Sequence, residues 1–288
     1  MTNLNNHILV CCHKKDIMAT QEPYFPIQLG KVNSNIDLGV ATDYTGENIS
    51  YKNPFFCELT GIYWAWKNMK DTEVIGLCHY RRYFDFHGIC QHFKPYTIFP
   101  LSSFQSINLS IPAKIIDAAK EGSIILPRRE NYPTSVIEQY NNNHSCFDIQ
   151  IIRDIIKNDF DEKYSRAFWK VLVQNNKLSL CNMFIMNWAN FDNYCSWLFH
   201  ILNKAELSID ISNYSTYQKR IYGFLAERLL NVWVYAEKKR IKRYPMIFFS
   251  EQQDKLSVIP SWKYGIGCYL NNVMNLTRRV EQKFNLTP

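Results

Sequence analysis

No stretch of the 288-residue sequence approaches the about 20 consecutive apolar residues that a membrane-spanning helix needs. After the polar residues 1–7, the first apolar run covers only residues 8–12, which is too short for the core of a secretory signal. These two absences predict a cytoplasmic protein without a membrane span of its own, which can still lie against the inner face of a membrane.

Sequence patterns that hold metals are also scarce. None of the nine cysteines belongs to a Cys-x-x-Cys pair, which argues against a zinc knuckle or a thioredoxin-like motif. Most cysteines lie inside apolar runs, as reduced cysteines do in cytosolic proteins. The single Asp-x-Asp string, Asp159 to Asp161, lies between two expected helices, and Asp161 is expected to cap the second. We therefore assign no metal ligands and leave a divalent Mg or Mn ion open as a cofactor.

The overall charge limits the range of partners. A formal net charge of +7 suits a partner that carries phosphates, whereas a nucleic-acid-binding domain is usually more basic over a shorter length. The sequence has no RNP-like, KH-like or helix-turn-helix signature, so no nucleic acid is expected as a partner. A non-enzymatic module that binds RNA or another polyanion remains the alternative to an enzyme.

Short apolar runs alternate with amphipathic stretches along the chain. Strands are expected at 8–12, 74–78, 123–126, 182–186 and 246–249, and helices at 53–69, 113–121, 134–175 (two or three helices), 192–204 and 216–240. Asn53 and Pro54 are suited to begin the first helix. This alternation predicts an α/β fold with a mainly parallel sheet flanked by helices and a helical C-terminal half. Residues 1–250 are expected to form one domain, and residues 251–288 an extension that packs on it or on a membrane surface.

Positive side chains follow three of the expected strands. Because ligands of such sheets bind beyond the carboxyl ends of the strands, these loops predict a rim that binds a diphosphate. Arginine suits this role, since its planar, permanently charged fork grips two phosphate oxygens. The alternative is that these side chains only pair with surface carboxylates. The loops are His13-Lys14-Lys15, His79-Tyr80-Arg81-Arg82 and Arg128-Arg129.

A polar stretch at 43–58 supplies further candidates. Asp43 and Asn48 are expected to bind the ribose or base of a nucleotide, and Lys52 a phosphate. Glu58, together with Asn182 at the start of the strand expected at 182–186, is expected to bind the nucleotide or the sugar. The alternative is ordinary turn chemistry, because Asp, Gly and Asn are also the common residues of loops.

Glu227 is the candidate general base, since transfer to a hydroxyl requires a group that removes its proton. It lies in an expected helix that also contains Gly223, and a glycine there suggests that another segment approaches the backbone closely. The alternative is that Glu227 and Arg228 lie on a surface helix without chemistry.

Farther along, residues 238–243 carry five cations. We expect them to form either a solvated helix end or a patch that binds an anionic membrane.

An ordered series of motifs resembles the bacterial polysaccharide-biosynthesis glycosyltransferases marked by the sequence His-Tyr-Arg-Arg-Tyr-Phe. The resemblance extends over about residues 8–250, nearly the whole chain. It is carried by His13-Lys14, Pro26-Ile27 with Gly30, Asp43-x-x-Gly-x-Asn48-Ile-Ser, Lys52-Asn53, Glu58-Leu-Thr60, Tyr63-Trp-Ala-Trp-Lys-Asn68, Gly76-Leu-x-His-Tyr-Arg-Arg-Tyr-Phe84, Asn182-Met-Phe-Ile185 and Gly223-Phe-Leu-Ala-Glu-Arg-Leu229.

This resemblance implies a sugar-nucleotide-dependent transferase with a fold related to the GT-A type. The family occurs in gene clusters for capsule, exopolysaccharide and O-antigen, and includes galactofuranosyltransferases. The expected reaction moves a hexosyl group, with galactofuranosyl as one candidate, from a UDP-sugar to an undecaprenyl-linked or other oligosaccharide acceptor at the inner leaflet of the cytoplasmic membrane. The expected roles follow from the residues above: His13, Lys14, Lys52, His79, Arg81 and Arg82 at the diphosphate, and Glu227 as the base.

Overall fold

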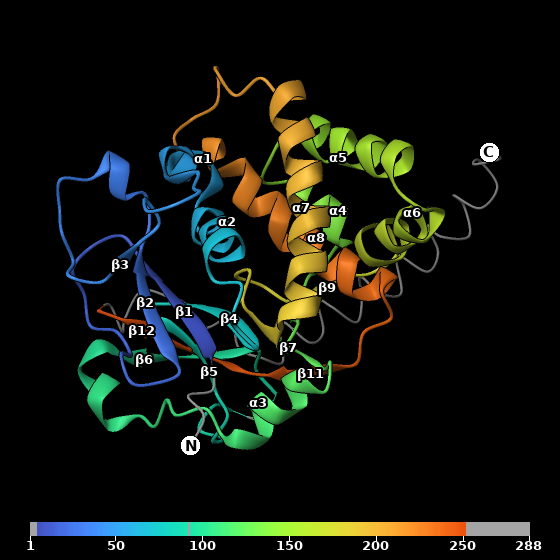
Figure 1. Cartoon of the computed structure of the whole chain (residues 1–288). Helices are drawn as coiled ribbons and strands as arrows, with labels where there is room; N and C mark the ends of the chain where they lie inside the picture. Colours follow the sequence, from blue (N-terminus) through green and yellow to red (C-terminus); the bar gives the residue numbers. More distant parts are fainter. Residues whose placement is uncertain (1–4, 92, 252–288) are drawn as a thin grey trace.

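A computed structural model describes residues 5–91 and 93–251 of the chain. At its centre is a mixed sheet of ten strands, in which the order along the main path is β11-β7-β10-β4-β1-β2-β3, and β5 connects β4 to β12 and β6 (Figure 1). The strands are β1 Asn6–Cys12, β2 Tyr24–Gln28, β3 Ala41–Thr42, β4 Val74–His79, β5 Arg82–Phe84, β6 Tyr96–Pro100, β7 Ile124–Pro127, β10 Phe184–Asn187, β11 Ile241–Tyr244 and β12 Met246–Ser250. A separate small sheet pairs β8 Glu130–Asn131 with β9 Lys177–Leu178.

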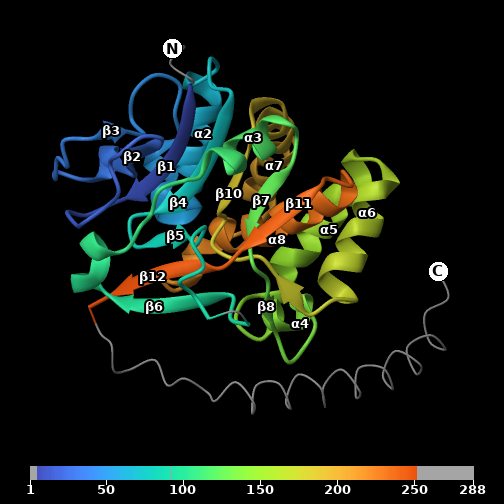
Figure 2. The same ribbon diagram turned by 90° about the horizontal axis from the view of Figure 1, so that it is seen from below.

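Helices cover both faces of the sheet. Figures 1 and 2 show α3 on one side and α2, α7 and α8 on the other. The α-helices are α1 Asn53–Phe56, α2 Leu59–Asn68, α3 Ala113–Lys120, α4 Val136–Asn141, α5 Cys146–Asp159, α6 Glu162–Phe168, α7 Trp188–Ser208 and α8 Ile221–Ala236. Short 3-10 turns are η1 Lys31–Asn33, η2 Ser50–Lys52, η3 Leu101–Ser106 and η5 Gln218–Arg220, and η4 Trp169–Val173 is a π-helix.

The predicted α/β fold is confirmed, with one strand direction that the sequence did not indicate. Strands β1, β2, β3 and β4 are mutually parallel, as are β7 and β11. Strand β10 is antiparallel to both of its neighbours, β4 and β7. The amino end of β10 therefore lies at the same edge of the sheet as the carboxyl ends of β1 and β4. The predicted extension at 251–288 falls, from residue 252 onward, outside the described residues.

The helix expected over 53–69 is interrupted. Cys57 has φ 52° and ψ −129°, which ends α1 after one turn, and Glu58 then begins α2. Asn53 is the first residue of α1 rather than its cap, and its side-chain amide donates instead to the Cys57 carbonyl at 2.9 Å and to Thr60 Oγ1 at 3.2 Å. The sequence pattern did not indicate this break, because the apolar periodicity continues across it.

The basic run at 238–243 is not the helix end that its composition suggested. Helix α8 ends at Ala236, and residues 241–244 form β11, which pairs in parallel with β7. Arg240 Nε donates to Ser123 Oγ at 2.7 Å just before β11 begins. Because side chains alternate along a strand, Lys242 is exposed while Arg243 is half-buried, so the cations do not share one face.

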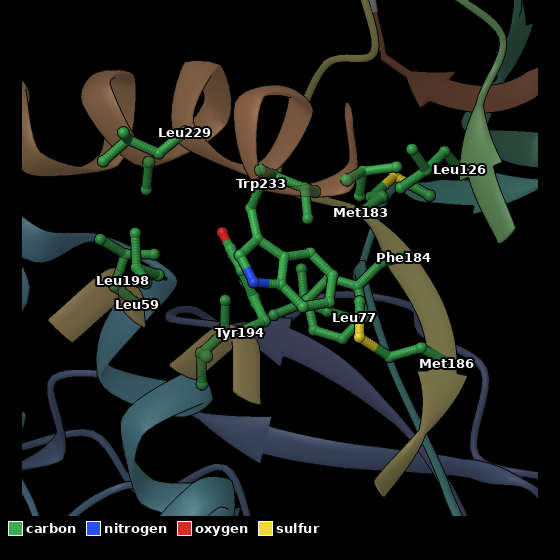
Figure 3. Packing of buried hydrophobic residues seen from close by; sticks show 14 of the residues in the cluster. Leu59, Leu77, Leu126, Met183, Phe184, Met186, Tyr194, Leu198, Leu229 and Trp233 are labelled. Carbon is green, nitrogen blue, oxygen red and sulfur yellow. The ribbon is translucent and has the colours of Figure 1, made fainter. Parts of the chain in front are cut away.

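The packing between the sheet and α8 centres on Trp233, whose side chain is fully buried. Figure 3 shows it among Leu77 of β4, Phe184 of β10 and Tyr194 of α7, and its ring centroid lies 5.3 Å from that of Tyr194. Burial of this much aromatic surface stabilises the position of α8 against the sheet.

Over the described residues, no helix combines the length and the apolar character needed to cross a membrane.

Replacement of Trp233 by alanine is expected to lower the free energy of unfolding by about 3–5 kcal/mol, because it leaves a large cavity between α8 and the sheet. Urea denaturation followed by circular dichroism measures the change. Tyr235→Ala is the matched control, since this ring lies on the same helix but is half exposed. Equal losses in the two variants would contradict a central role for Trp233.

Candidate active site at the sheet edge

A cavity of about 810 Å³ lies at the edge of the sheet where β1 and β4 end. Residues from many parts of the chain form its walls: the ends of β1, β2 and β4, the α1–α2 junction, β6, the segment just before β10, η5 with α8, and β12. Its lining residues are Cys11, His13, Leu29, Asn53, Pro54, Cys57, Glu58, His79, Tyr80, Arg81, Arg82, Ile98, Cys181, Tyr217, Arg220, Gly223, Phe224, Glu227, Phe248, Phe249 and Ser250.

Glu227 projects into this cavity from α8. Its Oε2 accepts the backbone N–H of Cys181, and its Oε1 accepts from Arg228 Nη1 at 3.0 Å. Burial raises the pKa of the Glu227 carboxyl above its usual range, and the nearby charge of Glu58 acts in the same direction. Arg228, the Cys181 N–H and Arg82 oppose this rise. A carboxylate with a raised pKa is a stronger base than an exposed one.

The close approach that Gly223 suggested is confirmed. A Cβ atom built on Gly223 would lie 3.3 Å from both Cβ and Sγ of Cys57. The glycine thus allows the α1–α2 junction to pack directly on α8. This contact brings Glu58, the residue after Cys57, to the same cavity as Glu227.

Glu58 is held from the start of β10. Its Oε1 accepts from Asn182 Nδ2 at 2.6 Å, and the same amide donates to the Gly223 carbonyl at 3.1 Å. Cys181 and Asn182 both have left-handed backbones, with φ 69° and 51°. Asn182 is 2% exposed and does not line the cavity, so its geometry suits a positioning residue better than the nucleotide contact expected from the sequence.

His79 lines the cavity and forms a hydrogen bond to the backbone. Its Nε2 lies 2.8 Å from the Cys181 carbonyl oxygen. Since a carbonyl only accepts, Nε2 carries a proton and donates it. Burial lowers the pKa of the imidazole below its ordinary value, and the charges of Arg82 and His13 lower it further, whereas Glu58 and the Cys181 carbonyl raise it. The lowered pKa favours the neutral imidazole, so His79 is less suited than an arginine to provide a positive charge.

Arg81 lines the cavity, but its charge is already balanced. Its Nη2 lies 2.7 Å from Asp16 Oδ2 and also pairs with Glu251. The Asp16 side chain is only 5% exposed, so this pairing holds the loop after β1 to the loop after β4. Lys14 lies 3.9 Å from the same carboxylate and does not line the cavity.

Two arginines of the cavity have no carboxylate partner within residues 5–91 and 93–251. Arg82 is exposed, its guanidinium lies over the Phe248 ring at 5.2 Å, and Nη1 lies 3.6 Å from Cys181 Sγ. Arg220 donates from Nε to Cys57 Sγ at 3.2 Å. These two arginines are the groups best placed to attract an anion. The predicted diphosphate-binding rim included Arg82 but not Arg220. The sequence shows Arg220 only as one cation within the helix expected at 216–240.

His13 also lines the cavity, at the end of β1. Its ring meets Tyr80 edge to face, with centroids 5.5 Å apart. Burial lowers the pKa of His13, and the charges of Lys14 and Arg220 lower it further. The lowered pKa favours the neutral form of His13.

An aromatic wall completes the cavity on the side of α8. Tyr217 and Phe224 line it, with ring centroids 5.2 Å apart, and His144 stacks on Phe224 from behind at 4.4 Å. Tyr217 is 55% exposed. The high aromatic content indicated stacking surfaces in general, but no sequence pattern indicated these two rings.

Several predicted site residues lie elsewhere. Asp43 is fully buried and accepts from the backbone N–H of Gly30 at 2.8 Å and from Ser50 and Thr60 hydroxyls at 2.6 Å each. Asn48 bonds to its own turn: its Nδ2 donates to the Tyr44 and Gly46 carbonyls and its Oδ1 accepts from Ser50 N. For both residues the turn-chemistry alternative describes the geometry.

Lys52 and the third cationic loop are also outside the cavity. Lys52 Nζ pairs with Glu206 of α7. Arg128 donates to the Lys94 carbonyl at 3.2 Å, and Arg129 lines a separate, smaller cavity. The predicted rim thus comprises the ends of β1 and β4 but not the loop after β7.

Within the described residues, no group of three or more His, Cys, Asp or Glu side chains is placed to hold a metal ion. Asp161, the second residue of the Asp-x-Asp string, is the N-cap residue of α6 as expected.

Comparison with known proteins places this architecture. The family model described as Domain of unknown function (DUF4422) matches residues 7–239. Among solved structures, the chain is similar to the apo structure of the bifunctional glycosyltransferase WbbM, with a TM-score of 0.76 and 27% identity. The match covers 85% of this chain and 45% of that one, so the chain spans less than half of its structural relative. No curated protein matches. The structural match confirms the predicted fold related to the GT-A type.

Replacing Asp43 by alanine separates a structural role from ligand binding. We expect the free energy of unfolding to fall by roughly 3 kcal/mol, because buried backbone and hydroxyl donors lose their acceptor. We expect the folded fraction to bind nucleotides as the unchanged protein does. Urea denaturation and titration calorimetry measure the two quantities, with the exposed Asp71→Ala as control. Lost nucleotide affinity at unchanged stability would restore Asp43 as a ligand-binding residue.

Proposed function

The chain belongs to the DUF4422 family, and we propose that it is a glycosyltransferase that transfers a hexosyl group from a nucleoside diphosphate sugar. The observation that carries this proposal is one cavity in which Arg82 and Arg220, both without carboxylate partners in the described chain, face the same space as the carboxylates Glu58 and Glu227. The similarity to a bifunctional glycosyltransferase supports the proposal, with 45% of that chain matched.

The two arginines would bind the donor diphosphate. As the bond between sugar and diphosphate breaks, negative charge accumulates on the leaving phosphate, and preorganised cations stabilise it. Guanidinium groups suit this role because they stay charged and bind phosphate oxygens in pairs. The stacking of Arg82 on Phe248 and the contact of Arg220 with Cys57 hold both groups before the donor arrives.

Glu227 would act as the base toward the acceptor. The acceptor hydroxyl oxygen forms a bond to the anomeric carbon of the donor sugar. The bond from that carbon to the diphosphate oxygen breaks, and its electron pair leaves with the diphosphate. The proton of the acceptor hydroxyl moves to the Glu227 carboxylate. The raised pKa of this carboxyl favours proton uptake. Glu58, whose Oε1 is held by Asn182, would bind sugar hydroxyls, and Tyr217 and Phe224 would pack against an apolar ring face.

The finer identity of the substrates rests on the motifs of the sequence. The family that these motifs resemble supports a UDP-sugar, with UDP-galactofuranose as one candidate, and a lipid-linked oligosaccharide acceptor in capsule or O-antigen synthesis at the inner leaflet. The polyanion-binding alternative gives no role to Glu58 and Glu227, the two carboxylates that line the same cavity as the arginines.

The double substitution Arg82→Ala Arg220→Ala is expected to weaken UDP binding by at least about 100-fold, because two charged hydrogen-bond donors are removed from the diphosphate. Titration calorimetry with UDP measures the change. Arg166→Ala on α6 is the control, since its exposed guanidinium pairs with Glu162 away from the cavity. Unchanged UDP affinity in the double variant would remove the diphosphate role of these arginines.

Glu227→Gln is expected to lower kcat by about 100-fold or more, because glutamine cannot take up the acceptor proton, while the KM for the donor changes little. The unchanged enzyme should lose activity as pH falls through the raised pKa of Glu227, since the protonated carboxyl is no base. This acidic limb should disappear in the variant. Product formation from a panel of UDP-hexoses, followed across pH, measures both effects. Glu162→Gln is the control. An unaltered pH profile in Glu227→Gln would exclude Glu227 as the general base.

A further inference from the structure

A second cavity, of about 280 Å³, lies beside the carboxyl-terminal half of α8 and shares no lining residue with the candidate active site. Four cations from four different segments line it. Arg129 follows β7, Lys170 comes from the π-helix η4, Lys177 from β9 and Arg243 from β11. Strands β7 and β11 pair in parallel and end side by side, and β8, which follows Arg129, pairs with β9. These pairings bring Arg129, Lys177 and Arg243 together.

Within the described residues, no carboxylate balances the positive charge of this basic cavity. None of its lining residues there is an aspartate or glutamate, and none of its four cations lies within ion-pair distance of a carboxylate in that part of the chain. Arg243 Nε is buried and has no hydrogen-bond partner among residues 5–91 and 93–251. Burial, followed by the like charge of Arg129, lowers the pKa of Arg243 to about 10.

Such an arrangement is unfavourable until an anion joins it. Like charges that converge in a partly desolvated cavity raise each other's free energy, and a buried donor without an acceptor adds to the cost. A phosphate group offers several acceptor oxygens at once, which matches two guanidinium forks and two ammonium groups. The π-helix η4, a rare element that is frequent at functional sites, contributes Lys170 and Val171 to this wall.

We propose that the basic cavity is a binding site for a phosphate group carried by a small phosphorylated ligand or by a lipid headgroup. The volume of the basic cavity suits a phosphate with a small substituent. It is far smaller than the volume of the candidate active site. Tyr235, which lines the cavity, is half exposed, so its ring provides apolar surface for the rest of the ligand. The site is independent of the proposed transferase function.

Arg129→Ala Lys170→Ala tests the proposal with two exposed side chains, so that folding is preserved. Inorganic phosphate is titrated into the unchanged protein, this variant, the Arg82→Ala Arg220→Ala variant and the control Lys157→Ala, and binding is followed by calorimetry. We expect saturable binding to weaken about tenfold or more in Arg129→Ala Lys170→Ala and to persist in the other two variants. Absence of saturable binding to the unchanged protein, or equal affinity in Arg129→Ala Lys170→Ala, overturns the site.

The Arg82→Ala Arg220→Ala variant separates this test from the proposed function. Phosphate binding lost only in that variant would locate the anion at the candidate active site and overturn the basic cavity as a site. Flotation with vesicles of phosphatidylcholine, alone or mixed equally with phosphatidylglycerol, then identifies the source of the phosphate. Vesicle binding that requires phosphatidylglycerol, Arg129 and Lys170 supports a lipid headgroup, whereas phosphate binding without vesicle binding supports a soluble ligand.

Discussion

The hydrogen bond from the Cys181 backbone N–H to the Glu227 carboxylate joins the amino end of β10 to α8, and the candidate active site depends on it. The same short segment accepts from His79 through the Cys181 carbonyl and binds Glu58 through Asn182. Both residues have left-handed backbones, which turns successive polar groups toward three different elements. One reversed strand thus positions two carboxylates and an imidazole together.

The distribution of charge in the cavity follows from which cations already have partners. Arg81 is adjacent to Arg82 in sequence, yet Asp16 and Glu251 balance only Arg81. Arg82 lies on the other face of the chain, over Phe248, and stays available to a ligand. The cavity consequently contains two guanidinium groups without a carboxylate partner in the described chain, two imidazoles of lowered pKa and a carboxylate of raised pKa. This combination suits a leaving diphosphate and an acceptor proton.

The sequence predicted the features that follow from local patterns. Alternating apolar runs predicted the α/β class, and polar residues after buried strands located His79 and Arg82 at a cavity, since strand ends of a parallel sheet share an edge. Residues whose roles depend on distant segments were not predictable. The partner of Arg81, the burial of Asp43 and the place of Arg220 all depend on contacts between segments far apart in the chain.

A structure of the protein with a UDP-sugar bound would show directly where the diphosphate lies. We expect diphosphate oxygens within hydrogen-bonding distance of the Arg82 and Arg220 guanidinium groups, with the anomeric carbon on the side of Glu227. A diphosphate bound elsewhere, such as beside Arg129 and Arg243, would contradict it, as would a donor whose anomeric carbon points away from Glu227.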